Sequence, residues 1–318
     1  MNGLLIIDKP EGLTSFDVVA VLRRTLKTKK AGHTGTLDPM ATGVLPVCLG
    51  ESTRLVPFII DGDKTYEASV RLGASTDTQD RTGKVIAEAP VPQSLTREAL
   101  EQALDRFRGE IDQAPPMYSA VRVDGKRLYE LAREGKEVDR IARRVTVHEL
   151  QVLDLSLPDL RMRVRCSKGT YIRTLAHDLG EVLGCHAHLT ALRRTESTGF
   201  SIAQAVTLDE LTRLNRDALA SRILTPSQAL AALPAVVVPD ALVVRLTQGQ
   251  RLPVAELNLA VGQDGERVRM LSTAGELLAV AEWRAGGLQY LRVLAGAPQP
   301  PAASGGGEKK SGGPGSGR

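Results

Sequence analysis

One aspartate in the sequence could act as a nucleophile or a general base. Asp38 lies between Leu37 and Pro39 within residues 31–50, a segment rich in glycine, threonine and proline. Its glycines permit backbone conformations that other residues avoid, so the segment is predicted to be a loop and not one regular helix. Aspartates in such loops also form turns and cap helices, and residue type alone leaves these roles open.

Signatures of several other chemistries are missing. The sequence contains neither GxxxxGKS/T nor GxGxxG, the glycine-rich loops that bind nucleotide phosphates, and no pattern of a Ser–His–Asp hydrolase. A single carboxylate without a metal or cofactor signature narrows the chemistry to covalent or acid–base catalysis on an organic group.

Residues that could bind a metal are sparse. Cys48, Cys166 and Cys185 are widely separated and form no CxxC pair, so the sequence indicates neither a zinc ribbon nor a disulfide framework. His186 and His188 would share one face of a strand, but no acidic or sulfur ligand stands at a standard spacing beside them. We therefore expect no metal site and no cofactor.

Positive charge is concentrated in two segments that contain no acidic residue. Residues 22–36 carry Arg23, Arg24, Lys27, Lys29 and Lys30, and residues 161–173 carry Arg161, Arg163, Arg165, Lys168 and Arg173. Localised positive charge suits a phosphate backbone, whose neutralisation releases counterions. The net charge of +4 is only mildly basic, however, and a solvated charged face explains the pattern equally well.

Alternation over residues 161–166 predicts a strand with two different faces. Met162, Val164 and Cys166 fall on one face and the three arginines of the segment on the other. Arginine favours bidentate contact with phosphate over generic solubility. We therefore predict contact with a phosphate backbone by Arg161, Arg163, Arg165 and the nearby Lys168.

Local patterns predict the elements around these residues. Strands are expected at 3–8, 66–72, 118–123 and 161–166, and helices after Thr14 or Ser15, after Thr96 and over 170–183. Residues 126–144 carry charges of both signs and few apolar side chains, which indicates a projecting lobe. After Pro234, β-rich runs separated by glycine-containing turns indicate a small β domain, and from Ala297 the composition predicts a disordered tail.

Length and composition are those of an ordinary globular protein. The 318 residues, 42% of them hydrophobic, can form one large domain and a small one. No apolar run approaches the roughly 18 residues that cross a bilayer, and the N-terminus lacks the basic flank and cleavage site of a signal peptide. We expect a cytoplasmic protein without membrane contact.

Several segments resemble motifs of the TruB family of bacterial tRNA pseudouridine synthases, and they occur in the family's order. Residues 32–45 (GHTGTLDPMATGVL) resemble its catalytic motif and residues 3–10 (GLLIIDKP) its N-terminal motif. Residues 115–121 (PPMYSAV) resemble the start of its mobile RNA-gripping insertion, and residues 166–173 (CSKGTYIR) its third active-site motif. The run Leu192-Arg193-Arg194-Thr195 continues the match.

The resemblance implies roles for individual residues. Asp38 corresponds to the essential nucleophile, Arg173 to the arginine that pairs with it, and Tyr66 to the tyrosine that stacks on the flipped base and helps in proton handling. The implied substrate-binding residues are His33, Tyr171, Leu192, Lys9 and Pro10. Because an adjacent guanidinium favours a carboxylate, Arg173 is expected to keep Asp38 ionised.

The resemblance also implies an α+β fold in several parts. A catalytic domain with a mixed sheet is expected at 1–233, with a mobile RNA-binding insertion at 115–145, a β-rich PUA-like domain at 234–296 and a disordered tail at 297–318. The implied reaction is isomerisation of uridine-55 in the T loop of tRNA, with the uridine flipped out of its stack. The implied enzyme is a monomer that grips the T stem-loop and elbow and uses no guide RNA.

Two other functions fit the same sequence. A non-catalytic RNA-binding or tRNA-folding protein would use the same basic strand, insertion and C-terminal domain, but would not need Asp38 or Arg173. A guide-dependent relative that modifies ribosomal RNA is the third possibility, although the C-terminal segment here is short and carries only a glycine-rich tail beyond it.

Overall fold

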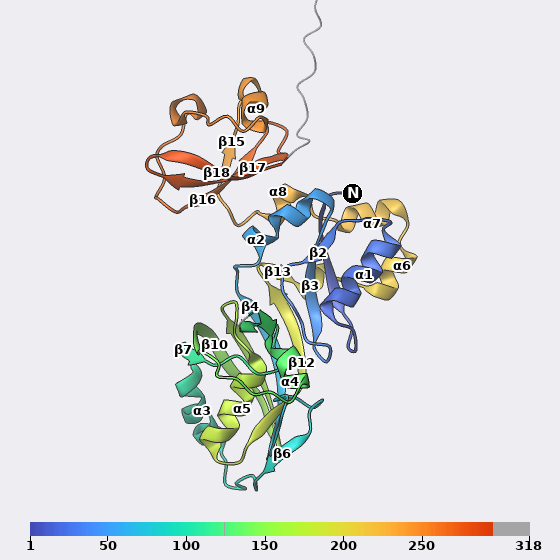
Figure 1. Cartoon of the computed structure of the whole chain (residues 1–318), viewed down its shortest axis with the longest axis vertical. Coiled ribbons are helices and arrows are strands. Elements are labelled where there is room, and N and C mark those ends of the chain that lie inside the picture. The colour runs from blue at the N-terminus through green and yellow to red at the C-terminus, as the bar shows by residue number, and fades with distance from the viewer. Residues whose placement is uncertain (124, 295–318) are drawn as a thin grey trace, which may run out of the picture. The chain divides into compact units, whose positions relative to one another are not determined.

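The computed structural model describes residues 1–123 and 125–294. It divides the chain into two compact units, Met1–Ala232 and Leu233–Arg318 (Figure 1). Each unit has its own hydrophobic core. The tail expected at 297–318 lies outside the described residues.

A large mixed sheet forms the centre of the first unit. Its strands are β1 (Gly3–Lys9), β2 (Ala31–His33), β3 (Thr42–Leu49), β4 (Lys64–Leu72), β7 (Gly109–Gln113), β10 (Arg143–Ser156), β11 (Asp159–Cys166), β12 (Ala187–Ser197), β13 (Phe200–Ser201) and β14 (Val206–Thr207). The order is β14-β1-β3-β12-β4-β11-β10-β7, with β2 paired to β3 and β13 to β12. The β1–β14 and β12–β3 pairs are parallel.

Short strands and helices surround this sheet. The two small hairpins are β5 (Ala74–Thr76) with β6 (Val85–Glu88), and β8 (Arg122–Val123) with β9 (Lys126–Arg127). The α-helices are α1 (Ser15–Thr25), α2 (Val56–Ile59), α3 (Arg97–Leu104), α4 (Leu128–Arg133), α5 (Ile172–Leu183), α6 (Leu208–Arg213), α7 (Arg216–Arg222) and α8 (Pro226–Ala229). The described part of the unit also contains the 3-10 turns η1 (Gly50–Leu55), η2 (Asp105–Phe107) and η3 (Ile202–Gln204).

The predicted helix starts are confirmed for α1 and α3 and shifted for α5. Thr14 and Asp17 form a reciprocal capping box at α1, and the Thr96 side chain accepts from a main-chain N–H of α3. The helix α5 begins at Ile172 and not at Thr170. The Thr170 hydroxyl donates back to the Ser167 carbonyl at 3.0 Å, so it does not cap the helix.

The strand predicted at 118–123 is wrong for most of its length, because only β8 is extended and paired. The carbonyls of Ser119 and Val121 accept hydrogen bonds from the main-chain N–H groups of Tyr129 (3.1 Å) and Leu128 (2.8 Å). The segment is therefore tied to the start of α4 and not to a neighbouring strand. The predicted strands at 3–8, 66–72 and 161–166 are present as β1, β4 and β11.

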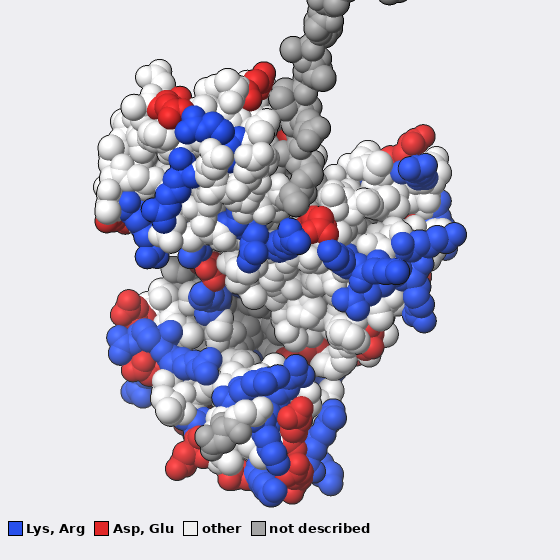
Figure 2. All heavy atoms as spheres, turned by 45° about the horizontal axis from the view of Figure 1, so that its top comes forward, with Lys and Arg blue, Asp and Glu red and all other residues white. Residues whose placement is uncertain are grey.

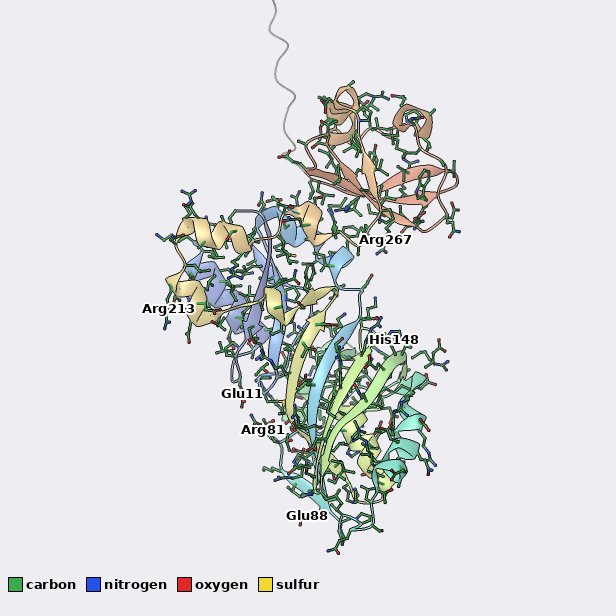
Figure 3. The ribbon with its side chains drawn as sticks, turned by 180° about the vertical axis from the view of Figure 1, so that it is seen from behind. Glu11, Arg81, Glu88, His148, Arg213 and Arg267 are labelled. Atoms are coloured by element: carbon green, nitrogen blue, oxygen red, sulfur yellow. The ribbon has the colours of Figure 1, made fainter. Side chains whose placement is uncertain are left out.

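The two faces of the central sheet differ, as the alternation in residues 161–166 predicted. Met162 and Val164 are fully buried, and they pack with Leu175 and Leu179 of α5 in the main core. Figure 1 and the rear view in Figure 3 place α3 and α5 on one side of the sheet. Arg161 and the other odd-numbered side chains of β11 point to the opposite side.

The second unit is a small sheet with one α-helix in its described part. The elements are β15 (Ala235–Val237), α9 (Asp240–Thr247), the 3-10 turn η4 (Val254–Leu257), β16 (Arg267–Leu271), β17 (Leu277–Arg284) and β18 (Gly287–Val293), and the strands follow one another in sequence order. Residues 240–247 are helical, whereas the sequence indicated only β-rich runs. Leu242, Val243 and Leu246 share the face of α9 that packs into the core around Trp283.

Candidate active site

Asp38 lies in the connection between β2 and β3, and the main chain on its N-terminal side is held firmly. The N–H of Leu37 donates to the Ser15 hydroxyl at 2.8 Å, and that hydroxyl donates to the Leu37 carbonyl at 3.1 Å. The Leu37 side chain is buried in the main core. The Asp38 side chain keeps 34% of its surface exposed, so a substrate can reach the carboxylate.

Lys9 holds the loop from the other side. Its side chain is fully buried, and its Nζ donates to the carbonyls of Pro10 (2.8 Å), Leu13 (2.6 Å) and Pro39 (3.3 Å). Burial lowers the pKa of Lys9 to about 8, while the nearby Asp38 carboxylate acts in the opposite direction. Pro10 itself is exposed and contributes its carbonyl.

Arg173, at the start of α5, pairs with Asp38. Its Nε lies 3.0 Å from Asp38 Oδ2, although the N–H is not aimed well enough to form a hydrogen bond. Nη1 donates to the Thr78 carbonyl (3.0 Å) and lies 3.5 Å from Asp80 Oδ2, and Nη2 donates to the Tyr118 carbonyl (2.8 Å). The guanidinium is therefore fixed between two carboxylates and two main-chain oxygens.

Opposed effects act on the pKa of Asp38. Desolvation raises the pKa of Asp38 above its ordinary value, and the Arg173 guanidinium opposes that rise without cancelling it. The neighbouring Asp80 carboxylate acts in the same direction as desolvation. The arginine thus favours the ionised form, as expected, while desolvation leaves the pKa of Asp38 above its ordinary value.

Tyr66 and Leu192 come from adjacent strands of the sheet. Tyr66 on β4 stands opposite Val164 of β11 and Arg194 of β12, so these three side chains share the α5 side of the sheet. Tyr66 and Leu192 are 9% and 7% exposed, and both belong to the main core. Burial raises the pKa of the Tyr66 hydroxyl, and the charge of Arg194 opposes that rise.

Tyr171 and His33 lie at the ends of elements. Tyr171 is the N-cap residue of α5, where its main-chain N–H and carbonyl are bound by the two ends of the Gln113 amide at 2.7 and 3.0 Å. His33 ends β2 and is partly buried. Desolvation, followed by the charge of Arg194, lowers the pKa of His33, so its neutral form is favoured.

The four residues predicted to contact RNA backbone are not brought to the Asp38 loop. Arg161, Arg163 and Arg165 project from the sheet face opposite Tyr66, as the β4–β11 register requires. Three of the four cations are paired with acids: Arg161 with Glu67 (3.5 Å), Arg165 with Asp63 (3.0 Å) and Lys168 with Asp61 (2.6 Å). On the face drawn in Figure 2, acidic side chains likewise lie beside basic ones at several places.

Three buried polar residues that hold parts of the site were given no role by the sequence analysis. Asp80 receives hydrogen bonds from Thr78 and Thr82 and pairs with Arg173. Gln113 fixes the start of α5, and Arg194 binds the Asp38 loop. Asp80 lies in a stretch of threonines and aspartates that is typical of a turn, so the sequence did not mark it as a site residue. Arg194 was noted only as part of the matching run of residues 192–195.

Comparison with known proteins decides the family. The chain is 50% identical over 296 residues to tRNA pseudouridine synthase B of Azoarcus sp. (strain BH72), covering 93% of this chain and 95% of that protein. It is 47% identical to tRNA pseudouridine synthase B of Cupriavidus pinatubonensis (strain JMP 134 / LMG 1197), covering 92% and 94%. The chain belongs to the TruB family. It is therefore a pseudouridine synthase.

Two models of the TruB family match successive segments. Residues 23–172 match the N-terminal domain of the TruB family pseudouridylate synthases, and residues 173–234 match the tRNA pseudouridylate synthase B C-terminal domain. The second match ends where the second compact unit begins.

Solved structures support the α+β fold expected for the TruB family. The crystal structure of a Cbf5-Nop10-Gar1 complex contains a chain with a TM-score of 0.73 and 30% identity, covering 92% of this chain and 84% of that chain. An H/ACA RNP bound to a substrate RNA containing 2'-deoxyuridine contains one with a TM-score of 0.72 and 27% identity, covering 93% and 86%.

Among the described residues, no helix is long and apolar enough to cross a membrane.

Proposed function

We propose that this chain isomerises uridine-55 in the T loop of tRNA to pseudouridine, with Asp38 as the nucleophile. The observation that carries the proposal is the Asp38–Arg173 ion pair of 3.0 Å in a loop that Lys9 and Ser15 hold from two sides. The relatives named tRNA pseudouridine synthase B support tRNA as the substrate.

The reaction is an isomerisation, so the product contains the same atoms as the substrate. It requires a nucleophile. The N1–C1′ bond of the uridine breaks, the uracil turns, and a C5–C1′ bond forms, after which the proton leaves C5 and N1 gains one. Asp38 acts in its ionised form, on the base or on the ribose. Arg173 favours that form and orients the carboxylate.

The flipped uridine is proposed to occupy a pocket beside Asp38. Tyr66 supplies the aromatic surface that replaces the stacking lost when the base leaves the T loop, and it helps to move the C5 proton. Tyr171 and Leu192 line the pocket, and His33 in its neutral form helps to hold the extruded nucleotide. Lys9 and Pro10 support the loop below Asp38.

The grip on tRNA is proposed to come from three parts of the chain. Residues 115–145 form the mobile insertion of the catalytic domain (1–233), and the exposed cations of its hairpin and α4 support RNA contact. Residues 234–296 act as a PUA-like RNA-binding domain. Arg161, Arg163 and Arg165 contact backbone outside the uridine pocket, because their sheet face is turned away from Tyr66, and Lys168 in the turn after β11 extends this contact.

The proposed enzyme works as a cytoplasmic monomer without a guide RNA. The structural neighbours come from complexes that include other proteins or RNA. The relatives at about 50% identity are named as tRNA enzymes, which favours the guide-independent function. A purely RNA-binding role would leave the arrangement of a partly exposed Asp38 on the buried Arg173–Asp80 pair without a purpose.

The proposal is tested with Asp38→Asn, which keeps the shape of the side chain and removes its charge. We expect no pseudouridine formation in a T-loop minihelix and an RNA affinity within severalfold of the wild type. Glu67→Gln is a suitable control, because it removes a carboxylate from the opposite sheet face. Substantial turnover by Asp38→Asn would remove Asp38 from its assigned role.

A further inference from the structure

Arg194 on β12 is a buried cation without a carboxylate partner in the described part of the chain. Its side chain is 1% exposed. Its guanidinium instead donates to three main-chain carbonyls, from Nε to Val44 (2.7 Å), from Nη2 to Gly35 (3.1 Å) and from Nη1 to Thr36 (3.4 Å). Burial of a charge that lacks an opposite charge is costly, so the retention of arginine here calls for a reason beyond packing.

The three carbonyls lie on both limbs of the loop that carries Asp38. Gly35 and Thr36 precede Asp38, whereas Val44 follows it within β3. The planar guanidinium has its donors in a rigid fork, so a single group joins the two limbs. The main chain of Arg194 also pairs with Gly43 in the parallel β12–β3 contact. Movement of either limb would break bonds to the same residue.

Arg194 also meets Tyr66. The two residues are direct partners in the antiparallel β12–β4 pair, so their side chains lie beside each other on the same sheet face, and the positive charge of the guanidinium acts on the Tyr66 hydroxyl. Arginine has only donors, so in any hydrogen bond between these two side chains the phenol oxygen is the acceptor. The positive charge also works against the rise in the pKa of Tyr66 that burial causes.

We infer that Arg194 is a positioning residue for the isomerisation, which holds the Asp38 loop and the Tyr66 hydroxyl in a fixed relation to each other. This inference rests on the proposed function, because Arg194 acts only through Asp38 and Tyr66. A nucleophile and a proton-transfer group must both lie within a fraction of an ångström of their productive positions. The loss of Arg194 therefore lowers turnover much more than it lowers RNA affinity.

The neighbouring Arg193 offers a matched control. It lies on the same strand but points to the opposite sheet face, where Nη2 pairs with the Asp8 carboxylate at 2.7 Å and joins β12 to β1. Its side chain is 42% exposed. A general effect of removing an arginine from β12 would appear in both variants, whereas a positioning effect appears only at Arg194.

The test compares Arg194→Lys with Arg193→Lys. Lysine keeps the charge but is a point donor that cannot reproduce the fork of a guanidinium across the carbonyls of Gly35, Thr36 and Val44. For Arg194→Lys we expect a cooperative thermal transition, a kcat on a T-loop minihelix lower by about 100-fold, and a KM within about threefold of the wild type. Amide hydrogen exchange should become faster across residues 32–44. Arg193→Lys should stay within about threefold of the wild type in all these measurements.

Three results would overturn the inference: a folded Arg194→Lys with wild-type kcat, an equal loss in Arg193→Lys, or an Arg194→Lys that has no thermal transition and so marks a folding residue. Asp38→Asn is measured in parallel. If the wild type is inactive or Asp38→Asn is active, the proposed function fails. If the wild type is active and Asp38→Asn is inactive, the outcome bears on Arg194 alone.

Discussion

At the scale of single residues, the protonation state of Asp38 results from opposed effects. Desolvation raises the pKa of the carboxyl and the Arg173 guanidinium lowers it. The proposed attack needs the ionised carboxylate, so activity falls as the pH decreases through this pKa. Since the pKa is raised, this acid limb should lie above the ordinary carboxyl value of 3.8.

Substitution of Arg173 by methionine should shift this limb. Without the guanidinium, only the weaker effect of the Lys9 charge still opposes desolvation and the Asp80 charge, so the acid limb of kcat moves to higher pH. We also expect kcat at neutral pH to fall by at least about tenfold, because the carboxylate loses its orienting partner. Single-turnover rates on a minihelix between pH 5 and 8 measure both effects. An unshifted limb would show that Arg173 does not control the protonation of Asp38.

Lys9 should make stability depend on pH in the alkaline range. Its pKa is about 8 in the folded protein against the ordinary 10.5. Between these values the unfolded chain binds more protons than the folded chain, so the contribution of Lys9 to folding stability increases as the pH rises. Lys9→Met lacks this contribution and leaves carbonyls unsatisfied, which costs about 1–3 kcal/mol at pH 7.

The measurement is chemical denaturation of the wild type and Lys9→Met at pH 7, 8, 9 and 10. The difference in free energy of unfolding between the two proteins should grow with pH. Lys64, whose pKa is also lowered to about 8, is present in both proteins and cancels. A constant difference would mean that Lys9 keeps its ordinary pKa in the folded state.

At the scale of elements, the Asp38 loop depends on the close approach of β3 and β12. Gly43 has φ +100°, and a Cβ built on it would lie 2.2 Å from the Arg194 carbonyl oxygen. A side chain at this position would force the two parallel strands apart. Because β3 carries one limb of the loop, this change would also displace Asp38.

Gly43→Ala should therefore destabilise the protein by about 3 kcal/mol or more and lower kcat as well. Gly12→Ala is the matched control, because Gly12 also has positive φ (+89°) but no atom within 4 Å of a built Cβ. Backbone strain alone should cost about 1–2 kcal/mol there. Thermal and chemical denaturation of both variants separates strain from the clash, and equal losses would argue against the close approach of the two strands.

The arginines of β11 allow a test of RNA binding by one strand. Changing Arg161, Arg163 and Arg165 together to glutamine should make the salt dependence of binding to full-length tRNA shallower. The slope of the logarithm of the binding constant against the logarithm of the salt concentration should decrease in magnitude by about 0.9 for each phosphate that the variant no longer neutralises. Turnover of a bound minihelix should not change, because these side chains face away from Tyr66. The exposed Arg213, Arg216 and Arg222 of α6 and α7, changed together, control for net charge. An unchanged slope would mean that this face does not touch phosphate.

At the scale of the whole molecule, the sequence predicted what depends on local patterns. The alternation in β11 and the Thr14 cap of α1 are encoded by neighbouring residues, and the long motifs indicated the family. It did not predict the hydrogen bonds of Arg194 with residues 35, 36 and 44 or the pairing of Asp80 with Arg173, because these residues are distant in the chain. The sequence also could not predict how desolvation and the ion pair with Arg173 together set the pKa of Asp38, because burial is a property of the assembled fold.

The most direct test of the central claim is pseudouridine mapping on total tRNA that lacks the modification, incubated with purified protein and no guide RNA. We predict complete modification at uridine-55 of the T loop by the wild type and none by Asp38→Asn. Absence of modification without an added guide RNA, modification at a different position, or equal modification by Asp38→Asn would contradict the proposed function.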